Sequence, residues 1–96
     1  MLSINDIRQA TQKVGRKYGI KKAYLFGSYA KGYANDASDV DIMIEKGDLR
    51  GIGVSRFRLE LIDELGGTDV DVVTENGLRK KFYDLIKNDR ILMYGA

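Results

Sequence analysis

The sequence predicts a small mixed α/β (α+β) domain in which a sheet of about four strands is flanked by helices. Two observations lead to this fold class. Apolar residues recur at helical spacing in three segments, and short apolar or alternating runs typical of strands lie between them. Helix and strand patterns that alternate along a chain indicate the mixed α/β class. The 96 residues suit one domain, which we expect to span residues 1–96.

The first helix is expected to begin after Ser3, because Ser3 and Asp6 form a capping-box pattern with Asp in place of the usual Glu. Apolar residues then recur at helical spacing, namely Ile4, Ile7, Ala10, Val14 and Tyr18. Gly19 is expected to end this helix.

The next segment predicts two strands separated by a turn. Residues 23–26 form a short apolar strand, after which Ser28 is expected to cap a short helix over residues 29–32. Residues 33–37 are polar and turn-like. In the second strand Val40, Ile42 and Ile44 alternate with Asp39, Asp41 and Met43, so one face carries carboxylates.

The second half repeats the alternation. Residues 46–53 are expected to form a loop, followed by an amphipathic helix that ends at Gly66-Gly67 and carries Val54, Phe57, Leu61, Ile62 and Leu65. Residues 69–74 predict a third strand. A last helix, with a basic outer side, carries Leu78, Phe82, Leu85 and Ile86, and residues 91–94 predict the final strand.

Composition excludes several kinds of chemistry. The chain has no Cys and no His, which removes disulfides, thiolate chemistry, the usual zinc ligands and the usual general base. A net charge of +2 is too small to indicate a nucleic-acid partner, and we expect no direct nucleic-acid binding. No apolar stretch is long enough to span a bilayer and the N-terminus lacks a signal-peptide pattern, so we expect a cytoplasmic protein with no membrane contact.

The acidic strands are the candidate metal site. Asp39 and Asp41 lie at i and i+2 and therefore point to one face of their strand, although a solvated acidic face is an equally good interpretation of this pair alone. Asp69 and Asp71 repeat the pattern in the third strand. If these two strands pair, three carboxylates converge and can hold two Mg²⁺ ions, with Asp71 the preferred third ligand and Asp69 the alternative.

A phosphate-binding turn would complete such a site. Gly27 allows a sharp turn and close approach to a ligand, and Ser28 with nearby N–H groups can hold terminal phosphates. Taken alone, this pair is more often an ordinary helix cap. Lys31 lies one helical turn further on and can add a positive charge, or it is a solvated surface lysine.

Other charged and aromatic residues favour plainer interpretations. The basic residues Arg79, Lys80, Lys81, Lys87 and Arg90 more often mark a solvated helix face than a site for an acidic partner. Tyr29 and Tyr33 near the turn can stack on a base, but packing is as good an interpretation.

Gly27-Ser28, ten intervening residues and then Asp39-Val40-Asp41 resemble the signature of the DNA polymerase β-type nucleotidyltransferase superfamily. The longer string from Leu25 through Asp41 is similar to its small prokaryotic branch, the minimal nucleotidyltransferases (MNT). The similarity continues through residues 70–74 and the basic helix to residues 91–95, so it spans most of the chain. The family usually has Arg at the position of Lys31 in this chain. Lysine keeps the positive charge but cannot make the bidentate contact of arginine with phosphate.

The resemblance implies a fold, an activity and a partner. The fold would be that of the polymerase β-like nucleotidyltransferases. Gly27 and Ser28, with Lys31, would bind the nucleotide, and Asp39, Asp41 and Asp71 would be the catalytic metal ligands, with Asp71 helping to activate the acceptor. The chain would transfer AMP from ATP to a tyrosine of a HEPN ribonuclease toxin and act as its antitoxin in a hetero-oligomer. The absence of His fits, because such transfer depends on positioning and on cations.

Two other hypotheses compete with this enzyme. One is a non-catalytic antitoxin that neutralises the toxin by binding, which the small core and the amphipathic last helix favour. The other is a transferase for small molecules such as aminoglycosides, which the length disfavours because those enzymes usually carry a further substrate domain.

Overall fold

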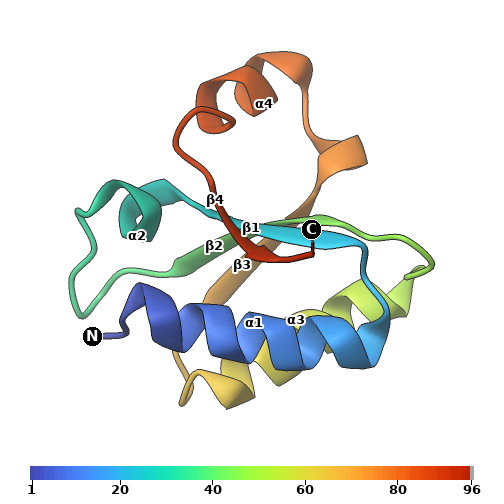
Figure 1. Cartoon of the computed structure of the whole chain (residues 1–96), viewed down its shortest axis with the longest axis horizontal. Coiled ribbons are helices and arrows are strands. Elements are labelled where there is room, and N and C mark those ends of the chain that lie inside the picture. The colour runs from blue at the N-terminus through green and yellow to red at the C-terminus, as the bar shows by residue number, and fades with distance from the viewer. Residues whose placement is uncertain (96) are drawn as a thin grey trace.

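The chain, described over residues 1–95 by a computed structural model, folds as a four-stranded sheet with helices on both faces (Figure 1). The elements in chain order are α1 (Ile4–Tyr18), β1 (Lys22–Phe26), α2 (Gly27–Lys31), β2 (Val40–Glu45), α3 (Ile52–Glu64), β3 (Val70–Thr74), the 3₁₀ turn η1 (Glu75–Gly77), α4 (Lys80–Ile86) and β4 (Ile91–Tyr94). The predicted fold class is therefore confirmed.

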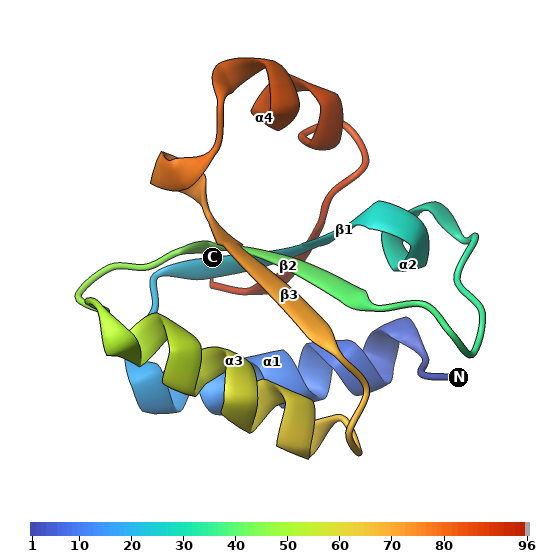
Figure 2. The same ribbon diagram turned by 180° about the vertical axis from the view of Figure 1, so that it is seen from behind.

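The sheet is mixed, with strand order β3-β2-β1-β4. β1 runs antiparallel to both β2 and β4, whereas β2 and β3 are parallel. The parallel pair places the two acidic strands side by side, as a metal site shared between them requires. α1 and α3 lie together on one face of this sheet, and α4 stands on the other (Figures 1 and 2).

The face under α1 and α3 holds most of the core. Alternate residues of the strands, such as Leu25 and Ile42, are fully buried there against helix residues such as Ile7 and Phe57. Burying one such side chain contributes about 1.5–3 kcal/mol. This face therefore carries most of the hydrophobic stabilisation of the chain.

The opposite face has a smaller apolar cluster. Tyr24, Phe26 and Met43 are buried there, and Val73, Leu78, Tyr83 and Ile86 pack against them. Within α4 itself, residues Lys80–Ile86, no side chain is buried. α4 therefore covers only part of this face.

The helix ends follow local rules. The Ser3 hydroxyl accepts from the Asp6 N–H at 3.0 Å, and the Asp6 carboxylate accepts from the Ser3 N–H at 2.9 Å, which confirms the capping box. These hydrogen bonds also lower the pKa of Asp6. Gly19 ends α1 with φ of 67°, as predicted.

Three local predictions were wrong. The helix after the first strand begins at Gly27, so Ser28 lies inside α2 and does not cap it. α3 begins at Ile52, within the predicted loop, with Gly51 as its N-terminal cap residue and the Val54 N–H donating to the Gly51 carbonyl at 3.2 Å. Leu78 lies before α4, in the segment after η1, where it packs on the sheet instead of on a helix face.

Among residues 1–95, no helix is long and apolar enough to cross a membrane.

Candidate active site

The candidate site lies where β2 and β3 begin, on the face that α4 partly covers. In the parallel ladder Asp41 is the register partner of Asp71. Met43 and Val73, two residues further along each strand, belong to the apolar cluster under α4. Because side chains alternate along a strand, Asp41 and Asp71 point to that same face.

Asp41 is the centre of this carboxylate group. Its side chain is half-buried, and burial, followed by the negative charges of Asp71 and Asp39, raises its pKa to about 6. A cation placed between the carboxylates would relieve this repulsion and lower the same pKa. The site is thus electrostatically prepared for a positive ligand.

Asp69 is not part of this group, and the expectation that Asp69 and Asp71 share a face was wrong. β3 begins one residue later, at Val70. The Asp69 carboxylate accepts from the Arg58 guanidinium of α3 at 2.9 Å and from the Val70 N–H at 3.0 Å. It therefore turns toward the helix that covers the other face.

Gly27 approaches Asp41 so closely that a side chain at position 27 would force the Asp41 carboxylate to move. A Cβ at Gly27 would lie 2.2 Å from Asp41 Oδ2, and the backbone there has φ of 72°, a left-handed conformation that side chains disfavour. The start of α2 at Gly27 therefore lies directly against the Asp41 carboxylate. This is the position that the sequence predicted for a phosphate-binding turn.

The remaining predicted site residues differ in exposure. Asp39 is exposed one residue before β2, and Lys31 is the exposed last residue of α2. Tyr29 is buried in the core under α1 and α3, so packing was the correct interpretation, whereas Tyr33 is 77% exposed.

The donor atoms at the candidate site suit a magnesium ion. Carboxylate oxygens are the ligands that Mg²⁺ prefers, and Asp39, Asp41 and Asp71 supply them next to a turn suited to phosphate. Within residues 1–95, however, no group of three or more acidic side chains is arranged to hold a metal ion. The metal ligands accordingly stay a prediction.

The way in which α4 and the chain after it line this face was not predicted from the sequence. Arg90, assigned to a solvated basic run, lies over the Tyr24 ring at 4.0 Å and donates to the Tyr83 hydroxyl at 3.2 Å. Phe82 packs edge-on against Phe26, with ring centroids 6.2 Å apart. Helical spacing places Phe82 on a helix but does not reveal which part of the sheet that helix covers, and it gives no information on Arg90, which lies in the chain after α4.

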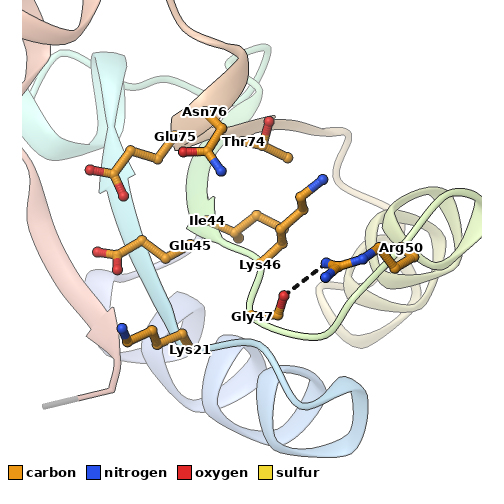
Figure 3. Close-up of a pocket in the computed structure, with 9 residues that line it drawn as sticks. All are labelled: Lys21, Ile44, Glu45, Lys46, Gly47, Arg50, Thr74, Glu75 and Asn76. Carbon is orange, nitrogen blue, oxygen red and sulfur yellow. Dashed lines mark hydrogen bonds between the residues drawn. The ribbon is translucent and has the colours of Figure 1, made fainter.

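A hollow of about 300 Å³ lies at the other end of β2, about 13 Å along the strand from Asp41 by the rise per residue (Figure 3). Its lining mixes positive and negative side chains, including Lys21, Lys46, Glu45 and Glu75, while Arg50 donates to the Gly47 carbonyl at 3.0 Å. None of the predicted site residues lines it. The candidate site is therefore distinct from this hollow.

Comparison with known proteins identifies the class. The family described as "Polymerase beta, Nucleotidyltransferase" matches residues 8–96. A candidate protein adenylyltransferase of Methanocaldococcus jannaschii is 34% identical over 91 residues, which cover 94% of this chain and 97% of the relative. The protein adenylyltransferase MntA of Thermococcus cleftensis is 26% identical over 83 residues, covering 82% and 84%.

Solved structures agree. A candidate minimal nucleotidyltransferase superposes with a TM-score of 0.79 at 28% identity, covering 92% of this chain and 90% of the other. A toxin–antitoxin complex with AMP-PNP matches with a TM-score of 0.78 at 25% identity, covering 97% and 75%. A further match, at 22% identity and a TM-score of 0.71, is to the complex of a tri-AMPylated Shewanella oneidensis HEPN toxin with its MNT antitoxin, and it supports the fold alone.

The fold and the sequence match together define a nucleotidyltransferase with the polymerase β-like fold. The chain belongs to the polymerase β nucleotidyltransferase family, as a minimal nucleotidyltransferase related to the MntA protein adenylyltransferases. The predicted enzyme class is therefore confirmed.

Proposed function

We propose that this chain transfers AMP from ATP to a tyrosine hydroxyl of a HEPN ribonuclease toxin, in a reaction that requires Mg²⁺, and thereby acts as the antitoxin. The relatives named as protein adenylyltransferases and the toxin–antitoxin complex that contains AMP-PNP support this activity. The observation that carries the proposal is the pairing of Asp41 with Asp71 beside Gly27.

The place of each residue supports a role in this reaction. Asp39, Asp41 and Asp71 would hold Mg²⁺, which when bound neutralises charge on the phosphates and lowers the pKa of the acceptor hydroxyl. Gly27 and Ser28 would hold the triphosphate by backbone N–H groups and the Ser28 hydroxyl, and Lys31 would add a positive charge from the end of α2.

The transfer itself needs no further group. The acceptor oxygen forms a bond to the α-phosphorus while the bond from that phosphorus to the bridging oxygen breaks, and pyrophosphate leaves. The proton of the acceptor hydroxyl passes to Asp71, which lies beside Asp41 on the edge strand β3.

The test is the intact mass of the HEPN partner after incubation with this chain, ATP and Mg²⁺. We expect a mass gain of one or more AMP units with the wild-type chain and none with the double variant Asp39→Asn/Asp41→Asn. The matched control is Asp48→Asn/Asp63→Asn, which removes two exposed carboxylates elsewhere and should leave the mass gain intact.

Other outcomes would overturn the proposal. Full transfer by Asp39→Asn/Asp41→Asn would contradict the role of these carboxylates. A stable complex of the wild-type chain with the toxin, without any mass gain, would favour the alternative of a non-catalytic antitoxin that neutralises by binding.

A further inference from the structure

We propose that Phe82 of α4 is the platform on which the nucleobase of the donor nucleotide stacks. This inference rests on the proposed function, because it assumes that the triphosphate lies at Gly27, Ser28 and the carboxylates. It assigns to α4 a role in nucleotide binding that neither the sequence motif nor the metal site supplies.

The first step is the position of Phe26. In the antiparallel ladder between β1 and β2, Phe26 is the register partner of Asp41, so the two side chains stand next to each other on the same face. Phe26 is also the residue before Gly27, and its ring is buried under α4. It therefore forms the apolar wall of the candidate site.

The second step is the contact between Phe26 and Phe82. The two rings are nearly perpendicular, at 85°, with centroids 6.2 Å apart. Phe82 therefore packs on the side chain that stands next to Asp41 in the ladder. In a nucleotide the base lies beyond the ribose from the phosphates, so a nucleotide whose phosphates contact Asp41 can place its base on an aromatic ring one side chain away, which is the position of Phe82.

The third step is exposure. Phe26 is 7% exposed, but Phe82 is 43% exposed, although both rings belong to one aromatic pair. Tyr83 and Ile86 pack against the cluster as half-buried side chains, whereas Phe82 touches it through Phe26 and stays largely exposed. Much of its ring surface is therefore available to a flat ligand.

The chemistry of the platform is stacking. Every base has a π-face, and an exposed aromatic ring binds it with little preference for sequence or base type. Phe82 would therefore orient the nucleoside and raise affinity without selecting adenine. Base selection, if present, would need polar groups elsewhere.

The test measures the dissociation constants of ATP and of inorganic tripolyphosphate, each with Mg²⁺, by calorimetry on the purified chain. Phe82→Leu keeps an apolar side chain on Phe26 but removes the π-face, and we expect it to weaken ATP binding about tenfold. Tripolyphosphate has no base, so its affinity should not change. Phe82→Trp should bind ATP at least as well as the wild-type chain.

The matched control is Leu85→Ala. Leu85 is 68% exposed on the same helix, and its replacement should change neither affinity. Equal ATP affinity in Phe82→Leu and wild type would overturn the proposal, as would an equal loss for ATP and tripolyphosphate, which would indicate a general disturbance of the site. If the wild-type chain bound neither ligand, this result would contradict both the proposed function and the proposed stacking role of Phe82.

Discussion

The two faces of the sheet differ in what they are built to do. The face under α1 and α3 is closed by fully buried residues such as Ile42 and Phe57, whereas the face under α4 combines a small apolar cluster with the carboxylates of Asp41 and Asp71. Both faces come from the same strands, because alternate residues point to opposite sides. One small sheet can therefore carry most of the residues that stabilise the fold on one face and the carboxylates of the candidate site on the other.

The largest expected effect on activity tests which aspartate of the third strand belongs to the chemical face. Asp71→Asn should lower the transfer rate by about 10³-fold, because it removes a carboxylate from beside Asp41. Asp69→Asn should retain transfer, because Asp69 is paired with Arg58 on the side of α3. Single-turnover rates with the HEPN partner measure both, and the reverse ranking would show that the assignment of the two residues is wrong.

The largest expected effect on stability belongs to the other face. Phe57→Ala should lower the free energy of unfolding by about 3–5 kcal/mol, because it leaves a cavity at a fully buried position. Urea denaturation measures this value. Where the variant is still folded, its transfer rate should stay near that of the wild type, and a large loss of rate in folded protein would show that the faces are not separable.

A smaller effect on the transfer rate is expected at Gly27, where β1 ends and α2 begins. Gly27→Ala should lower the transfer rate about 100-fold, because the new Cβ would displace the Asp41 carboxylate by about an ångström or more. Gly32→Ala is the control, since Gly32 has a similar φ of 82° but a Cβ added there would meet no atom within 4 Å. Both variants carry similar backbone strain. An equal loss of rate in the two would show that backbone strain, and not displacement of the Asp41 carboxylate, causes the effect.

The smallest expected effect is the pH dependence of stability without metal. The pKa of Asp41 is about 6 in the folded chain against 3.8 for an unperturbed Asp, so between these values the folded state holds a proton that the unfolded state has released. The contribution of Asp41 to the free energy of unfolding therefore falls as pH rises from about 4 to about 6.

Asp41→Asn should remove this dependence and make the metal-free chain more stable than wild type at pH 7. We expect about 1 kcal/mol, a value reduced for the partial exposure of the carboxylate. Urea denaturation at several pH values measures the difference in the free energy of unfolding between the two proteins. The contributions of other acids, such as Asp6, cancel in this difference. An identical pH dependence in both would contradict the raised pKa.

Local patterns determined the elements that depend on near neighbours. The capping box at Ser3 and Asp6, the end of α1 at Gly19 and the alternation in β2 involve residues within a few positions of each other, and all were predictable. The same alternation placed Asp41 and Met43 on one face. The carboxylates and the Gly-Ser turn were also identified as candidates from sequence, because their spacing is itself the motif.

The tertiary structure decided what the pairing of distant segments controls. Sequence alone left Asp69 and Asp71 as alternatives, and the Arg58 side chain of α3 together with the start of β3 at Val70 separated them. The placement of Phe82 beside Phe26 and of Arg90 over Tyr24 likewise depends on how α4 crosses the sheet. Periodicity in the sequence determines which residues lie on the same face of one helix or strand. Only the packing between elements determines which residues that face contacts.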